Sequence, residues 1–173
     1  TEGLDTPNNS LEEQGQSDAT SDSPVAPDGG VEDPDSVFRF LLEGLTVEPE
    51  LEGAYDRALF SHWLDFDNDG CDAREEVLLT ESIIPITPGP DCGLAGGLWG
   101  SDYDGIETSN PGEFDIDHFI PLAEAWASGA ANWDPYTRMR FANDLDYSKS
   151  LIAVSASSNR SRGAKDPTEW LPD

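Results

Sequence analysis

The sequence has little positive charge. Only nine lysine and arginine residues stand against 36 aspartate and glutamate residues, giving a formal net charge of −27 and a pI near 4.1. This balance argues against ordinary electrostatic attraction to nucleic acids or anionic membranes. No apolar run approaches the ~18 residues of a membrane-spanning helix, so we expect no membrane partner. An initial methionine and a basic-then-apolar leader are also lacking, which indicates a mature or recombinant form.

The acidity is unevenly distributed along the chain. Residues 1–36 carry ten acidic residues and no basic or aromatic residue, so we predict a disordered acidic tail or linker there. Residues 37–173 are predicted to form one domain. Within it, residues 37–137 have a charge of −18 and residues 138–173 a charge of +1. The basic residues are therefore concentrated in residues 138–173, which indicates a feature there that requires positive charge.

A strongly acidic folded domain repels itself at low salt and is tolerated when ions screen its surface. We interpret the composition as adaptation to a saline environment, with a merely acidic soluble protein as the alternative. The chain is expected to be a monomer.

The hydrophobic pattern indicates an α+β protein. Apolar spacing predicts helices over 37–46, 50–64, 75–84, 122–128 and 135–142, and strands over 114–120 and 151–154. Residues 85–112 are rich in proline and glycine and are expected to be irregular or to form short strands.

Cys71 and Cys92 have no neighbours at metal-ligand spacing. A disulfide is therefore the preferred interpretation, and two buried free thiols are the alternative. A disulfide indicates an oxidising, extracellular compartment, so we expect a secreted protein. Closing this loop should stabilise the fold by about 3 kcal/mol.

Two segments carry residues suited to phosphodiester hydrolysis: Asp115-Ile116-Asp117-His118-Phe119-Ile120-Pro121 and Asn159-Arg160-Ser161-Arg162-Gly163-Ala164-Lys165-Asp166. Aspartate and asparagine oxygens are hard ligands that suit Mg²⁺. A largely neutral histidine can take a proton from water near pH 7–8. Flanking arginines can bind a phosphate through two hydrogen bonds.

The order D-x-D-H-x-x-P, strand, N-R-x-x-G-x-K-D resembles the HNH endonucleases. The segments SHWLDFDNDGCDAREEVL, DIDHFIPLAEAWASGA, RMRFANDL and LIAVSASSNRSRGAKDPTEWLP together are similar to secreted bacterial HNH nucleases, over about residues 50–173. The resemblance implies an α+β fold with a ββα-metal (HNH) core, surrounded by additional helices and loops.

The resemblance also implies roles for single residues. His118 is expected to be the general base, and Asp117 and Asn159 the ligands of Mg²⁺ or Mn²⁺. Asn143 is expected to hold the loop between the strands by backbone hydrogen bonds, with an ordinary cap or turn as the alternative. The expected phosphate contacts, each with surface solvation as the alternative, are Arg160, Arg162 and Lys165.

Two other residues have open assignments. Arg74 is a candidate for supporting the charged phosphorane, and a structural ion pair is an equal alternative for it. His62 is interpreted as structural.

Residues 65–76 match the calcium-loop spacing D-x-[DN]-x-[DN]-G-x₅-E. The candidate ligands of a structural Ca²⁺ are Asp65, Asp67, Asp69, Cys71 (by loop position) and Glu76. A solvated acidic turn is the alternative.

These features predict a secreted, metal-dependent, sequence-nonspecific endonuclease that acts on DNA, with RNA as an alternative, leaves a 5′-phosphate, and is salt-tolerant or salt-activated. A different class remains open, namely a calcium-stabilised acidic binding module or nucleic-acid mimic without catalysis. A phosphodiesterase acting on small nucleotides is a third possibility.

Overall fold

The computed structural model describes residues 34–51 and 53–173, so the predicted tail at residues 1–36 lies almost wholly outside it. The chain divides into two compact units, one ending at Val47 and the other spanning Glu48–Asp173. The first unit contains α1 (Pro34–Glu43), which crosses the predicted boundary after residue 36. Most of its apolar side chains are exposed, including Phe38, Leu41 and Leu42.

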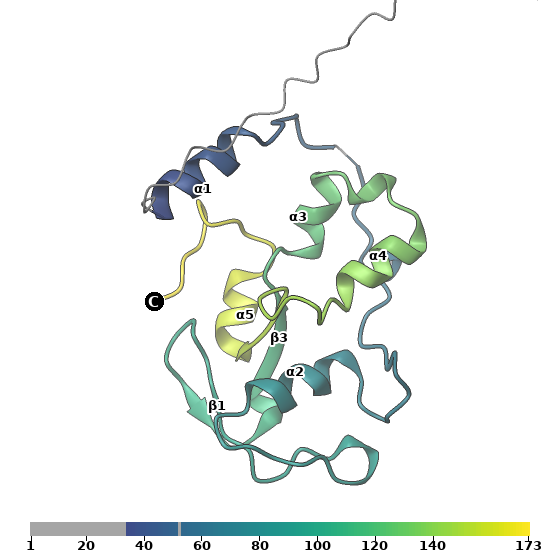
Figure 1. The fold of residues 1–173 in the computed structure, drawn as a ribbon, viewed down its shortest axis with the longest axis vertical. Coiled ribbons are helices and arrows are strands. Elements are labelled where there is room, and N and C mark those ends of the chain that lie inside the picture. Colours follow the sequence, from purple (N-terminus) through teal and green to yellow (C-terminus); the bar gives the residue numbers. More distant parts are fainter. Residues whose placement is uncertain (1–33, 52) are drawn as a thin grey trace, which may run out of the picture. The chain divides into compact units, whose positions relative to one another are not determined.

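The second unit is α+β, as predicted (Figure 1). Its α-helices and strands are, in chain order, α2 (Ala73–Glu81), β1 (Trp99–Gly100), β2 (Glu107–Thr108), β3 (Phe114–His118), α3 (Leu122–Ala127), α4 (Pro135–Ala142), β4 (Leu151–Ser155) and α5 (Ala156–Arg162). Its short 3₁₀ helices are η1 (Arg57–Leu59), η2 (Pro90–Cys92), η3 (Pro111–Glu113) and η4 (Ala130–Asn132).

Side-chain caps explain several helix starts. Asp72 accepts from the backbone of Glu75, and the Glu75 carboxylate accepts from the Asp72 amide, forming a complete capping box on α2. Asp134 caps α4 ahead of Pro135, and Ser155 caps α5. The cap at Ser155 lets α5 start directly where β4 ends.

Two short antiparallel pairs form the sheets, β1–β2 and β3–β4. In the second pair Phe114 lies opposite Ser155 and His118 opposite Leu151. Side chains alternate between the two faces of a strand. Ile116 packs with Val77, Leu78 and Trp99 in one buried cluster, whereas Val154 packs with Tyr103 in another. Both faces of the β3–β4 pair are therefore covered.

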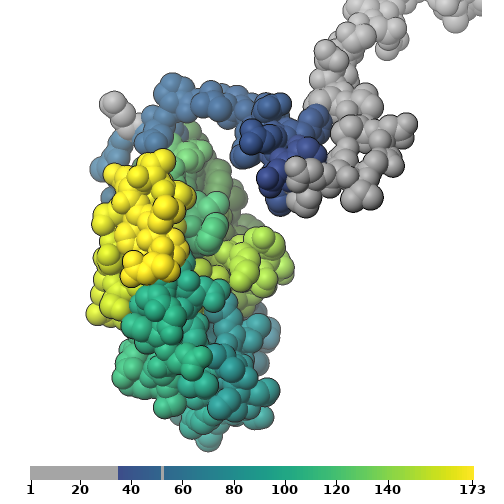
Figure 2. Space-filling model, turned by 90° about the vertical axis from the view of Figure 1, so that its left-hand side faces the viewer, coloured from purple at the N-terminus to yellow at the C-terminus, as the bar shows by residue number. Residues whose placement is uncertain are grey.

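The C-terminal segment lies against the segment around Tyr103. The Trp170 and Tyr103 ring centroids are 5.0 Å apart, and the Asp173 amide donates to the Tyr103 carbonyl at 2.9 Å. Figure 2 shows this contact on the surface, where the last residues (yellow) lie against the teal-green segment.

The predicted helix over residues 50–64 is wrong. Among the residues of this range that the structure describes, only η1 is helical, and Trp63 adopts a left-handed φ of 60°. The backbone groups of this segment bind elsewhere in the chain: Leu51 donates to Ala127, and Leu64 donates to the Asn143 side chain. The apolar residues that suggested a helix, such as Phe60, instead pack in a cluster with α3 and α4.

The predicted disulfide between Cys71 and Cys92 is present, with Cα atoms 5.1 Å apart. It joins the start of α2 to η2. Among the described residues, no helix is long and apolar enough to cross a membrane.

Candidate functional site

A pocket of about 260 Å³ opens where β3 ends beside α5. It brings together Asp117, His118 and Asn159, the three residues predicted to be the base and the metal ligands. Antiparallel pairing explains this, because β4 returns alongside β3 and α5 follows β4 without a loop. Residues 41 positions apart in the sequence therefore line one pocket.

His118 is 5% exposed, and its Nε2 lies 2.9 Å from the Ala142 carbonyl oxygen. A carbonyl can only accept, so Nε2 carries the proton and Nδ1 of the neutral ring keeps its lone pair. Burial lowers the pKa of His118 to about 4, with a further lowering from the positive charge of Arg57. The ring is therefore neutral at pH 7 and can accept a proton at Nδ1.

Asp117 is buried beside two donors. Its Oδ2 accepts from Arg162 Nη1 in an ion pair and from the Tyr103 hydroxyl at 2.8 Å. Burial raises the pKa of Asp117, and the hydrogen bonds from Tyr103 and Arg162 oppose this rise. With Oδ2 taken, Oδ1 is the oxygen left for a ligand.

Asn159 on α5 donates through Nδ2 to Asp115 Oδ2 at 3.2 Å. This bond orients the side-chain amide and leaves Oδ1 as its acceptor. Arg160 Nε lies 3.3 Å from the same Asp115 oxygen, and its side chain is 75% exposed. Arg160 is thus a cation beside the site, and most of its side chain remains in solvent.

Asn143 makes three backbone hydrogen bonds, one within the segment between β3 and β4 and two to residues 61–64. Its Oδ1 accepts from the Leu64 amide at 3.0 Å, and its Nδ2 donates to the Ser61 and Met139 carbonyls at 2.8 Å. The segment that it holds, residues 61–64, carries Trp63, whose ring centroid lies 5.6 Å from that of His118. Asn143 therefore positions the segment that carries Trp63 beside His118.

Two candidate arginines, Arg162 and Arg74, are bonded inside the fold and do not line the pocket. Arg162 is 7% exposed and donates to Asp117 and to the His118 and Phe119 carbonyls, so it supports the end of β3 from inside. Arg74 donates to the Pro111 and Phe114 carbonyls. Phe114 is at the opposite end of β3 from His118, so Arg74 has a structural role.

Lys165 is exposed, and its Nζ donates to the Ser161 carbonyl at 2.8 Å. It does not line the pocket, and its predicted phosphate contact stays a prediction.

The sequence did not predict that Arg57 and His62 form a hydrogen-bonded pair beside the pocket. His62 Nδ1 lies 2.7 Å from the Phe60 carbonyl, so it carries the proton, and Nε2 accepts from Arg57 Nη2 at 3.4 Å. Arg57 lines the pocket, and the His62 ring centroid is 6.1 Å from that of His118. One signal for Arg57 was present, because it is one of three basic residues within residues 37–137.

The acidic loop at residues 65–76 lies outside this pocket. The carboxylates of Asp65, Asp67 and Asp69 come within 4.8 Å of one another and are exposed. A Glu76 carboxylate oxygen lies within 4.8 Å of one of Asp69. Burial first, and then the charges of the three aspartates, raise the pKa of Glu76. Cys71 Sγ is in the disulfide, so it is excluded as a thiolate ligand. Calcium binding by the remaining residues stays a prediction.

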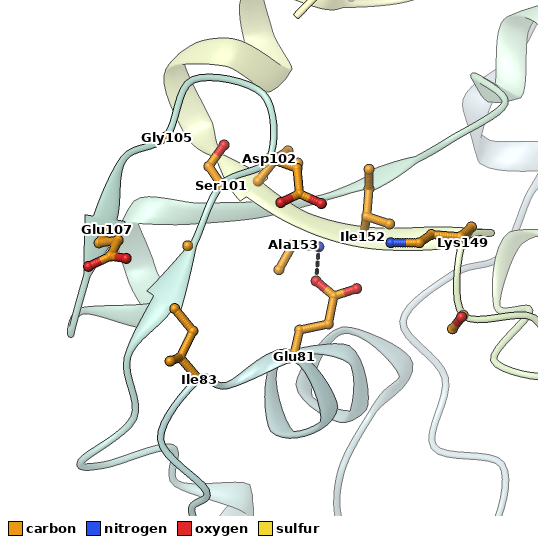
Figure 3. Close-up of a pocket in the computed structure, with 12 residues that line it drawn as sticks. Glu81, Ile83, Ser101, Asp102, Gly105, Glu107, Lys149, Ile152 and Ala153 are labelled. Carbon is orange, nitrogen blue, oxygen red and sulfur yellow. Dashed lines mark hydrogen bonds between the residues drawn. The ribbon is translucent and has the colours of Figure 1, made fainter.

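A separate hollow of about 540 Å³ lies between β1, β4 and the end of α2, and it is lined by none of the predicted site residues. Asp102 and Lys149 point into it (Figure 3). Glu81 accepts from the Ala153 amide at 2.8 Å. Burial raises the pKa of Glu81 even against this hydrogen bond. This carboxylate is held by the outer edge of β4.

No known family profile matches the chain, and no solved structure matches it. The chain is 39% identical over 138 residues to a protein of Arthroderma benhamiae described as an uncharacterized secreted protein. The alignment covers 79% of this chain and 66% of that relative, so the chain spans slightly less than two thirds of the relative's length. The predicted localisation is thereby confirmed: this chain is a secreted protein, similar over most of its length to a secreted fungal protein.

Proposed function

We propose that the protein is a secreted, metal-dependent, sequence-nonspecific endonuclease of the HNH type, acting on DNA or RNA. The observation that carries the proposal is the convergence of Asp117, His118 and Asn159 on one pocket. The order of two antiparallel strands followed at once by a helix supports it, because the resemblance in the sequence implies this arrangement.

The pocket fits a hard divalent cation by the chemistry of its donors. Asp117 Oδ1 and Asn159 Oδ1 are both oxygens, and Mg²⁺ favours a few protein oxygens with several retained waters. The ion pair with Arg162 already compensates part of the Asp117 charge, which favours modest metal affinity. A bound Mg²⁺ or Mn²⁺ would supply charge stabilisation at the scissile phosphate and its leaving oxygen.

The chain's own groups supply the rest of the chemistry. His118 takes a proton from the attacking water at Nδ1, while its Nε2 proton stays on the Ala142 carbonyl and fixes the ring. Arg57 faces the same pocket and can bind a phosphate oxygen, with His62 holding its guanidinium. In-line attack breaks the bond to the 3′ oxygen and leaves a 5′-phosphate.

The acidity of the chain is compatible with this activity at high salt. Screening removes the long-range repulsion between protein and nucleic acid. Basic nucleases gain affinity because counterions are released from the nucleic acid, and this gain is small at high salt. Short-range metal and arginine contacts therefore carry binding. We therefore expect activity to rise with NaCl before it falls.

Plasmid cleavage over 0–2 M NaCl, with Mg²⁺ or with EDTA, tests the proposal. We expect cutting with Mg²⁺ only, an optimum well above 0.2 M, and loss of at least about 100-fold in rate for His118→Ala. Asn159→Ala should need more Mg²⁺, whereas Asn132→Ala, at an exposed position in η4, is the matched control. A folded protein that leaves both the plasmid and a single-stranded RNA intact at every salt concentration would refute the proposal, and binding of basic proteins would then favour the acidic binding module.

A further inference from the structure

A second, apolar cleft shares a lining residue with the candidate catalytic pocket. That residue is His118, the proposed base. The cleft has a volume of about 90 Å³, and its other lining residues are Phe119, Ile120, Phe141, Tyr147, Lys149 and Ser150. None of these has a role in the reaction proposed above.

The rim of the cleft is aromatic and open to solvent. Tyr147 is 65% exposed and Phe119 is 55% exposed, and both come from loops beside the end of β3. Exposed aromatic rings next to a polar site commonly take part in binding, because they offer a flat apolar face with little conformational entropy to lose.

The backbone on both sides of the cleft is held in place. The Phe119 amide donates to the Ser150 carbonyl at 3.0 Å, and the Phe119 carbonyl accepts from Arg162 Nη2 at 2.6 Å. Next to Phe119, the Ser150 amide donates to the Tyr147 carbonyl at 2.9 Å, and the Ser150 hydroxyl donates to Asp144 at 2.5 Å. The backbone that carries Phe119 and Tyr147 is thus held by hydrogen bonds within the fold.

Resting on the proposed function, we infer that this cleft binds the nucleobase of a nucleotide next to the scissile phosphate, stacked on Tyr147 and Phe119. A phosphate at His118 places the adjacent base within reach of the cleft, since His118 is common to both spaces. Stacking on aromatic side chains tolerates any base, because every base has a flat π face. It requires the base to leave its own stack, so the enzyme favours single-stranded or locally opened nucleic acid.

Kinetics with Tyr147 variants test the inference. The wild-type chain, Tyr147→Ala, Tyr147→Phe and Tyr136→Ala are compared on a short single-stranded oligonucleotide and on the matching duplex, with Mg²⁺ at the best salt concentration. Tyr136 is the control, because it is also 65% exposed and does not line the cleft. Loss of one base–aromatic stack should lower kcat/KM of Tyr147→Ala on the single strand about tenfold, mainly through KM. The duplex rate should change less than twofold, and Tyr147→Phe should restore the wild-type value.

An abasic position gives an independent readout. In an oligothymidine with one central abasic site, the wild-type enzyme should cut beside that site about tenfold less than elsewhere in the strand. In Tyr147→Ala this difference should disappear. Equal kinetics of Tyr147→Ala and Tyr136→Ala on both substrates, while the wild-type enzyme still cuts plasmid, would overturn the inference alone. Absence of cutting by every form would overturn the proposed function with it.

Discussion

Arg162 and Asp117 form an ion pair in which both side chains are more than nine-tenths buried, although they are 45 residues apart in the sequence. The pair joins the end of β3 to the last turn of α5. It therefore fixes the geometry of the candidate pocket from the inside, and it replaces the substrate contact that the sequence predicted for Arg162.

Removing one partner of this pair should be costly. Arg162→Ala leaves the Asp117 charge buried without its cation, so we expect the free energy of unfolding to fall by about 3–5 kcal/mol. Urea unfolding followed by circular dichroism measures this. Arg160→Ala is the control, because Arg160 is mostly exposed and should cost under about 1 kcal/mol. Equal losses for the two variants would contradict the structural role of Arg162.

The hydrogen bonds from Asn143 to backbone groups give a second prediction about stability. Asn143→Ala removes three hydrogen bonds to backbone groups and should lower stability by about 2–4 kcal/mol. Hydrogen exchange at the Leu64 amide should accelerate in this variant. Asn143→Asp keeps the acceptor for Leu64 and loses the two donors, so it should protect that amide better than alanine does. An unchanged Leu64 exchange rate in Asn143→Ala would refute the assignment.

The acid side of the stability profile should depend on Asp104. Burial acts to raise the pKa of Asp104, but hydrogen bonds from Ser155, Ser158 and Ser101 outweigh it and lower the pKa to about 2, from 3.8. A carboxyl whose pKa is lower in the folded state stabilises the fold above its unfolded pKa. This contribution is therefore complete above about pH 4 and is lost as the pH falls toward 2.

Thermal melts of Asp104→Asn and of the wild-type chain between pH 2 and pH 7 measure this contribution. The variant should be less stable at pH 7 and should lose less stability on acidification. Asp166→Asn is a useful comparison, because its carboxyl also has a lowered pKa but bonds only within its own turn. Parallel curves for Asp104→Asn and wild type would contradict the prediction.

The acidic loop predicts a calcium effect on stability. If Asp65, Asp67, Asp69 and Glu76 bind Ca²⁺, millimolar CaCl₂ should raise Tm by several degrees, because a ligand that binds only the folded state stabilises it. Glu76→Gln should abolish the shift, and Glu107→Gln, an exposed glutamate outside the loop, should keep it. The same Tm with CaCl₂ and with EDTA would favour a solvated acidic turn.

Local signals predicted much of this fold. Alternation and apolar runs located β3 and β4, and apolar spacing located α4, whose Asp134 cap the structure adds. The failure at residues 50–64 has a physical cause, because apolar spacing reports burial and does not report which backbone groups will be bonded. There the partners came from distant residues, Asn143 above all.

The candidate site shows the same limit. Motif spacing identified His118, Asp117 and Asn159, which share one pocket. It could not separate arginines that are bonded inside the fold from arginines that face the pocket, because this depends on tertiary packing. Arg57 was therefore overlooked, and the internal hydrogen bonds of Arg162 were not foreseen.

The hydrogen bond from Ala153 to Glu81 has a consequence for the behaviour of the protein in solution. A strand at the edge of a small sheet exposes amides that can pair with another molecule and start aggregation. An acidic chain normally keeps its copies apart by long-range repulsion, and salt screens that repulsion. The Glu81 carboxylate is hydrogen-bonded to the Ala153 amide at this edge. It therefore blocks strand pairing even at ionic strengths that screen the repulsion between molecules.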